Sequence, residues 1–108
     1  MTRVYLPATA DDLSTWATER LIPVGAERVV AETEDEQDEY AALMTAADLA
    51  DPSRRIVVVA EVVGDGEGEI SWAEVAAVHA DPGARPADAD PDEDLAWFAT
   101  QEWDRLTP

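Results

Sequence analysis

The sequence predicts an α/β or α+β fold, in which about four strands form a small mixed sheet with about three helices, in the order β-α-β-α-β-β-α. Two observations support this prediction. Short β-branched segments alternate with segments whose apolar residues recur at helical spacing. Several segments also open on Ser or Thr followed three residues later by an acidic residue, which is the pattern of a capping box. A chain of 108 residues has the length of a single domain, which we expect to span residues 1–108.

The first third of the chain predicts a strand, a helix and a second strand. Residues 4–6 form a short apolar segment that stops at Pro7 and indicates a brief strand. Thr9 and Asp12 form a capping pair that opens an amphipathic helix. The apolar stripe of this helix consists of Leu13, Trp16, Ala17 and Leu21. The helix is expected to end before Pro23, and residues 28–31 indicate a second short strand.

The middle of the chain predicts a helix followed by a central strand. Thr33 and Glu36 form a second capping pair, and the acidic residues around them suit the first turn of a helix because of its macrodipole. The buried stripe of this helix consists of Tyr40, Leu43, Met44 and Ala47. Residues 56–63 are almost continuously β-branched, which favours a strand that is covered on both faces.

A glycine-rich turn at residues 64–68 separates the central strand from the next element. Ser71 and Glu74 form a third capping pair, over a segment that has room for one helical turn. The alanine-rich segment that follows is compatible with helix or strand, and we predict a strand from about Ala76 to Ala80.

The C-terminal segment predicts a last helix that starts near Pro91, after an acidic Pro/Ala loop at residues 81–92. One face of this helix would carry Leu95, Phe98, Ala99 and Leu106. Trp97 would project from the opposite face, with Gln101 one turn further on. An outward aromatic residue beside an amide is typical of a contact surface, although Trp97 could instead pack inside a three-layer fold. Glu102 would fall on the apolar face, where a carboxylate needs a partner such as an arginine.

The charge of the chain excludes one large class of function. Twenty-five acidic residues face seven basic ones, all seven are Arg, and the formal net charge is −18. Nucleic-acid binding needs clustered cations, so a nucleic-acid partner is not expected. The acidity has three explanations that stay open: a GC-rich genome, adaptation to high salt, or selection for a strongly basic partner. No apolar segment has the length of a signal peptide or membrane span, so we expect a cytoplasmic protein without a membrane partner.

The residues available for chemistry are few. The chain has no Cys and one His, so thiolate chemistry is excluded and a structural zinc site is not expected. Asp88, Asp90 and Asp92 have the spacing of the first ligands of a calcium loop. The glycine and the last carboxylate of such a loop would fall on Glu93 and Ala99, so the motif fails. We therefore predict no catalytic residues, no metal site and no cofactor.

Four parts of the chain are distinctive when they are taken together. They are residues 4–9, residues 39–42 followed by 54–58, residues 73–79, and residues 95–102. In this order they resemble a family of small uncharacterised proteins from high-GC actinobacteria, a domain of unknown function. The resemblance spans nearly the whole chain and implies an actinobacterial, cytoplasmic protein with no established activity. It marks six positions as candidate binding residues: Tyr5, Thr9, Tyr40, His79, Trp97 and Gln101.

The function expected from these observations is a non-enzymatic domain that binds an unknown protein partner or self-associates as a homodimer. One alternative is a small-molecule-binding protein or enzyme that uses His79 and nearby carboxylates. A pocket that contains His79 and at least two of Tyr5, Tyr40 and Gln101 would favour this alternative. A further alternative is an acidic mimic of nucleic acid, whose carboxylates would lie in rows at roughly the spacing of phosphates.

Overall fold

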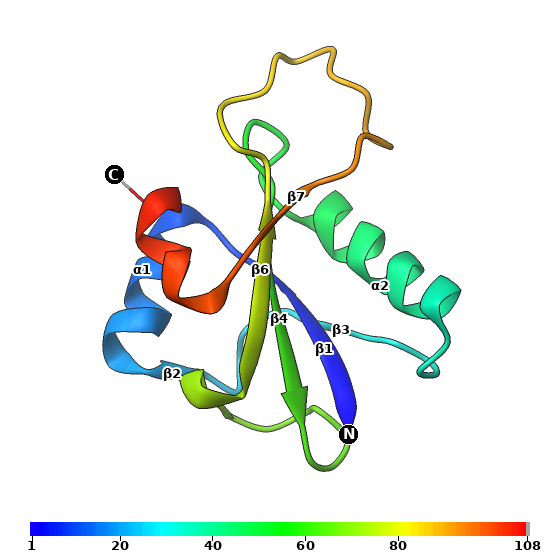
Figure 1. Ribbon diagram of the computed structural model, residues 1–108, viewed down its shortest axis with the longest axis vertical. Coiled ribbons are helices and arrows are strands. Elements are labelled where there is room, and N and C mark those ends of the chain that lie inside the picture. Colours follow the sequence, from blue (N-terminus) through cyan, green and yellow to red (C-terminus); the bar gives the residue numbers. More distant parts are fainter. Residues whose placement is uncertain (108) are drawn as a thin grey trace.

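The protein has a mixed α+β fold in which helices pack on both faces of a sheet; the computed structural model describes residues 1–107 (Figure 1). In chain order the elements are β1 (Thr2–Pro7), α1 (Ala10–Glu19), β2 (Leu21–Ile22), β3 (Val29–Val30), α2 (Glu36–Leu49), β4 (Ile56–Val62), β5 (Ile70–Ser71), the 3₁₀ helix η1 (Trp72–Glu74), β6 (Val75–Ala80), β7 (Ala96–Phe98) and the 3₁₀ helix η2 (Thr100–Leu106). The α+β class is confirmed.

The sheet differs from the one expected. Five strands form it in the order β3-β1-β4-β6-β7, and β2 pairs with β5 in a separate two-stranded sheet. Every neighbouring pair is antiparallel, so the prediction of a mixed sheet of about four strands is only roughly matched. The prediction that residues 56–63 form a strand covered on both faces is confirmed, because β4 lies in the middle of the order and nearly all of its residues are buried.

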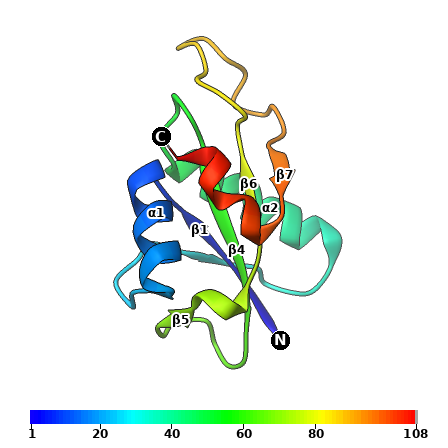
Figure 2. The same cartoon turned by 60° about the vertical axis from the view of Figure 1, so that its left-hand side comes forward.

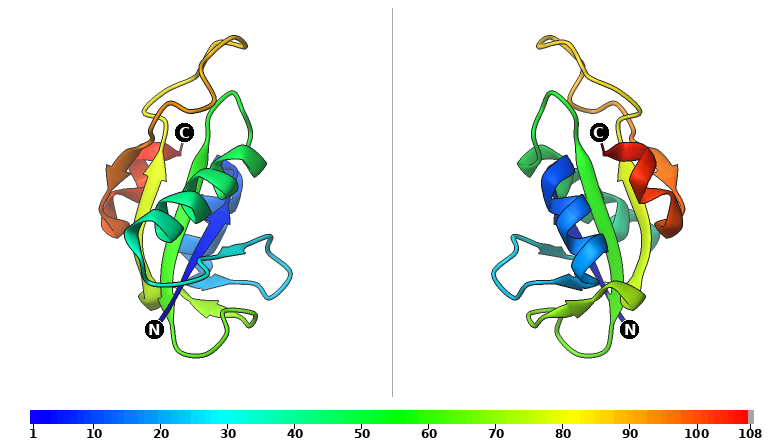
Figure 3. Two further views of the ribbon diagram at one scale, coloured as in Figure 1. Left: turned by 90° about the vertical axis from the view of Figure 1, so that its right-hand side faces the viewer. Right: turned by 90° about the vertical axis from the view of Figure 1, so that its left-hand side faces the viewer.

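Two apolar clusters lie on the two faces of this sheet, since alternate residues of a strand point to opposite sides. On one face, residues of β1, β4 and β6 pack against the apolar side of α1 and against η1 and η2. On the other face, α2 packs on β1, β3 and β4 through small residues that let the helix approach the sheet, namely Ala42, Ala46 and Ala47. Figure 3 shows α1 and α2 on opposite sides of the sheet.

The predicted helix starts are confirmed in two of three places. The Asp12 amide donates to the Thr9 hydroxyl oxygen over 3.0 Å, and the Asp12 carboxylate accepts from the Thr9 amide over 3.1 Å. At η1 the Ser71 amide likewise donates to the Glu74 carboxylate over 3.0 Å, and the Ser71 hydroxyl oxygen accepts from the Ala73 amide over 3.3 Å. Such pairs satisfy amide groups that have no partner inside the helix.

The other predicted start is wrong by two residues. Asp35 is the N-cap of α2, and its carboxylate accepts from the Gln37 amide over 2.8 Å. Thr33 instead donates its hydroxyl to the Asp38 carboxylate over 2.6 Å. Asp and Thr are both favourable N-cap residues, so the sequence alone does not decide between Thr33 and Asp35. Leu21 is also outside α1, because Arg20 adopts a left-handed conformation with φ of 60° and ends the helix.

The predicted C-terminal helix is only partly matched, because the helical turns are confined to Thr100–Leu106. Residues 96–98 form β7, which pairs with β6, and the 3₁₀ helix η2 follows. The apolar residues expected on one face are divided: Phe98 and Leu106 pack in the α1-side cluster, whereas Leu95 packs on the α2 side. Periodicity cannot separate a short apolar strand from a helix when the strand is only three residues long.

The Glu102 carboxylate has the partners that a carboxylate on an apolar face needs. It accepts a hydrogen bond from the Ala99 amide and lies 3.1 Å from the Arg105 guanidinium.

The glycine-rich turn after β4 is packed closely on the sheet. Gly66 has φ of +79°, and a Cβ at this position would lie 2.8 Å from a methyl group of Val4. Arg28 donates to the carbonyl oxygens of Gly66 and Gly68 over 2.9 and 2.6 Å. A glycine is therefore required at position 66, both for its left-handed backbone and for the approach to β1.

A buried ion pair joins the ends of β4 and β6. Arg55 and Asp81 are each 2% exposed. The Arg55 guanidinium donates to both carboxylate oxygens of Asp81, over 3.0 and 2.8 Å, and the Arg55 amide donates to the same carboxylate over 2.8 Å. The Asp81 amide returns a bond to the Arg55 carbonyl over 3.0 Å. Burial alone raises the pKa of Asp81, but the bonds and charge of Arg55 outweigh it, and the pKa is lowered.

The same guanidinium fixes the long segment between β6 and β7. It donates to the carbonyl oxygens of Pro91 and Glu93, over 3.2 and 2.8 Å. Arg85 lies 3.7 Å from the Asp81 carboxylate and donates its backbone amide to Ser53. Figure 2 shows this segment projecting beyond the end of the sheet before it returns as β7. The Arg55–Asp81 pair therefore determines where the chain enters β7.

We predict that Asp81→Asn destabilises the protein by about 3–5 kcal/mol at neutral pH, because it leaves a buried guanidinium without a counter-charge. The pKa of Asp81 is lowered in the folded state from 3.8, so its stabilising contribution is present above that pH and is lost as the pH falls below it. The gap in urea stability between wild type and variant should therefore shrink in acid. Asp88→Asn, in the same loop but exposed, is the control. Equal stability of the two variants at neutral pH would contradict this role for Asp81.

Candidate functional site

The α2 face of the sheet carries an exposed tryptophan. In the cross-strand register, Trp97 of β7 lies opposite His79 of β6, and His79 lies opposite Val57 of β4. The three side chains therefore form one row on the α2 side. Since α2 packs on β1, β3 and β4, the end of this row lies at the margin of the helix-covered area, and Trp97 is 62% exposed.

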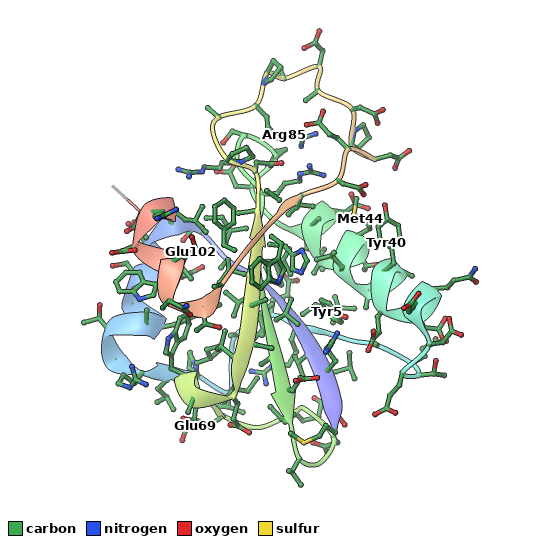
Figure 4. All side chains as sticks on the ribbon, viewed as in Figure 1. Tyr5, Tyr40, Met44, Glu69, Arg85 and Glu102 are labelled. Atoms are coloured by element: carbon green, nitrogen blue, oxygen red, sulfur yellow. The ribbon has the colours of Figure 1, made fainter. Side chains whose placement is uncertain are left out.

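Tyr40 brings the first half of α2 to the start of β7. Its hydroxyl donates to the Asp94 carboxylate over 2.7 Å, and this bond raises the pKa of Tyr40. Tyr40 is 51% exposed, and Figure 4 shows it with Met44 on α2. Leu95, which follows Asp94 in the chain, packs in the α2-side cluster. We call Tyr40, His79, Asp94, Leu95 and Trp97 the Trp97 surface.

A charged cluster lies further along the same face. Arg3 donates to the Glu61 carboxylate over 2.7 Å, across the β1–β4 pair, and lies 3.5 Å from the Glu39 carboxylate on α2. Arg3 thereby links α2 to the sheet. Tyr5 follows on the same face of β1 and is buried; burial raises its pKa, and the neighbouring Glu39 raises it further.

The environment of His79 keeps its imidazole neutral at pH 7. The pKa of His79 is lowered, mainly by burial and in addition by the positive charge of Arg3. A neighbouring carboxylate would act in the opposite direction, because it stabilises the imidazolium. The charge that most influences His79 is therefore a cation, and His79 can serve as an uncharged donor and acceptor.

The structure brings some of the sequence-predicted site residues together and separates others. Thr9 is exposed at the N-cap of α1 and lines a cavity of about 400 Å³ between that helix and the loop before β3. Gln101 is exposed on η2, which packs on α1 and β6. The prediction that Gln101 lies one helical turn from Trp97 is wrong, because Trp97 is in a strand. The residues on the α2 side are Tyr5, Tyr40, His79 and Trp97.

Cavities elsewhere involve different residues. Cavities of about 200 to 550 Å³ in the described chain have linings that include neither His79 nor Trp97. Within residues 1–107, no three His, Asp or Glu side chains are grouped so that they could hold a metal ion. In the same residues, no helix is long and apolar enough to cross a membrane.

Two members of the site could not be found from local sequence. Asp94 belongs to a run of acids that resembles a solvated loop, and its partner Tyr40 is 54 residues away. The apolar pattern predicts that Leu95 lies on one face of a helix. No local signal distinguishes them, because residues 95–98 are apolar throughout and are compatible with a helix or a strand.

We predict that His79 titrates below its ordinary value of 6.5, as observed by NMR of the single imidazole. Because the folded-state pKa is lowered, the contribution of this group to stability is present above pH 6.5 and is lost as the pH falls through the folded pKa. Arg3→Gln should move the pKa part of the way towards 6.5, since burial remains. Arg105→Gln, on η2, is the control and should leave it unchanged. A wild-type pKa at or above 6.5 would contradict this description of the site.

Comparison with curated proteins and with solved structures finds no match to this chain. The model of a family of unknown function, DUF6912, matches residues 2–107. This match includes every strand and helix of the fold and all residues of the Trp97 surface. It agrees with the expected resemblance to an uncharacterised domain, and the chain belongs to the DUF6912 family of unknown function.

Proposed function

We propose that this protein is a protein-binding module and that the Trp97 surface is its contact surface. The observation that carries the proposal is the exposed Trp97 at the margin of the sheet. Tryptophan side chains are highly buried on average, and tryptophan is among the residues that dominate the energetics of protein interfaces. Tyr40 adds a second exposed aromatic side chain on the same side of the sheet.

The position of β7 supports this proposal. β7 is an edge strand, because within residues 1–107 it pairs with β6 alone. An edge strand leaves backbone amide and carbonyl groups free to pair with an extended segment of another chain. A partner that pairs with β7 would place alternate side chains on the face that carries Trp97.

The surface is also held in place before any partner binds. Arg55 holds the carbonyl groups of Pro91 and Glu93, and Tyr40 holds the carboxylate of Asp94. These contacts lie in the short segment that precedes β7. A surface fixed in advance loses less conformational entropy on association, which favours binding.

Catalysis by His79 with nearby carboxylates has less support. The shift of the His79 pKa comes from burial and from Arg3, whereas a catalytic imidazole oriented by a carboxylate would have its pKa raised.

The partner on the Trp97 surface is a different protein or a second copy of this chain. A second copy must bring its own charge of −18, so a homodimer would tighten as added salt screens the repulsion.

We predict that Trp97→Ala abolishes partner binding and changes the free energy of unfolding by less than about 1 kcal/mol, because most of the side chain is already in solvent. The measurements are affinity capture from the native host, sedimentation velocity at low and high salt, and urea denaturation. Val63→Ala, at the other end of the sheet and 86% exposed, is the matched control.

Two results would contradict the proposal. One is a variant that keeps the same partners and the same mass in solution as wild type. The other is a loss of about 3 kcal/mol or more in stability without any change in association, which is the behaviour of a core tryptophan.

A further inference from the structure

The arginines of this chain are largely used inside the fold. Six of the seven make hydrogen bonds or ion pairs to groups of the same chain: Arg3, Arg28, Arg54, Arg55, Arg85 and Arg105. Three of these six, Arg3, Arg55 and Arg85, meet carboxylates across the sheet or its loop. The acidic side chains outnumber these partners by far, and most of them are exposed.

The Trp97 surface has an acidic border. Asp92, Glu93 and Asp94 are consecutive, exposed, and end directly before Leu95. Asp92 and Asp94 both lie close enough to the Tyr40 hydroxyl to affect its proton through their charge. Two arginines reach the backbone of this segment: Arg55 donates to the Glu93 carbonyl but is buried and paired with Asp81, and Arg85 donates to the Asp90 carbonyl. In the described chain, no ion pair joins an arginine to the carboxylates of Asp92, Glu93 or Asp94.

Aromatic faces and carboxylates together select cations. The face of an indole or phenol ring attracts a guanidinium or ammonium group through its quadrupole, and tryptophan does so most strongly. Carboxylates beside the ring add charge complementarity and draw the partner in from solution. A second copy of this chain offers the wrong charge for such a surface, and an acidic partner would meet repulsion.

We infer that the partner of the Trp97 surface is a basic, extended protein segment that pairs with the free edge of β7 and carries arginine or lysine at alternate positions. This inference rests on the proposed function and specifies its partner. The geometry of β7 defines the spacing of the cations in the partner. Trp97 and Leu95 lie on the same face of the chain. In a partner strand paired with β7, two cationic side chains separated by one residue would point to that face, towards the tryptophan and the acidic border.

The test uses a labelled octapeptide of alternating arginine and threonine and a twin in which citrulline replaces each arginine. Citrulline keeps the shape of the side chain and removes its charge. Binding to the full chain is measured by fluorescence anisotropy, with Trp97→Ala and Asp94→Asn as test variants. Val63→Ala and Glu67→Gln are matched controls, because both residues are exposed in the turn region beyond β4.

We expect the arginine peptide to bind wild type and both controls, and to bind Trp97→Ala about tenfold more weakly. Asp94→Asn should weaken binding less, because one charge of a wider border is removed. The citrulline twin should not bind detectably.

Three results would overturn the inference. If both peptides bind equally and both depend on Trp97, the contact surface stands but the partner is not selected for its charge. If the arginine peptide binds Trp97→Ala with the same affinity as wild type, the peptide is attracted by the net charge of the protein and does not bind at the Trp97 surface. If neither peptide binds while a Trp97-dependent partner is captured from the host, the proposed function stands and the basic segment is wrong.

Discussion

The Arg55–Asp81 pair is the interaction on which the positions of the C-terminal elements depend. It closes the end of the β4–β6 pair and uses its remaining donors to hold the carbonyl groups before β7. Buried ion pairs contribute little net stability compared with apolar residues of the same volume. Their advantage here is geometric, because one planar guanidinium can satisfy a carboxylate and two carbonyls in fixed directions. The pair thereby brings β7, and with it Trp97, to the edge of the sheet.

Other arginines, like Arg55, bind groups of the same chain and hold elements of the fold together. Arg28 holds carbonyl oxygens of two loops, Arg3 links α2 to the sheet, and Arg55 holds the loop before β7. These roles suit arginine, whose fork of donors can hold several acceptors at once. Because most of its few arginines are bound to groups of the same chain, the protein presents a strongly acidic exterior. The self-repulsion of that exterior opposes compaction, and a basic partner would relieve it.

Local patterns predicted the elements whose causes are local. The capping pairs at Thr9 and Ser71 and the apolar composition of β4 each depend on residues a few positions apart. β7 depends on pairing with β6 across a long loop, and the bond from Tyr40 to Asp94 spans 54 positions. Of the Trp97 surface, the sequence singled out Tyr40, His79 and Trp97, but neither Asp94 nor Leu95. The arrangement around it follows from tertiary contacts that no short pattern contains.

The role of the ion pair is tested most directly by hydrogen exchange of residues 91–99 in the double variant Arg55→Met/Asp81→Leu. Apolar residues of similar volume can replace a buried ion pair with little loss of stability, but they cannot hold the carbonyl groups of Pro91 and Glu93. We predict that global stability is nearly retained while amides of residues 91–99 lose protection. Unchanged protection in this segment, with β7 still paired to β6, would contradict the claim that Arg55 and Asp81 position the Trp97 surface.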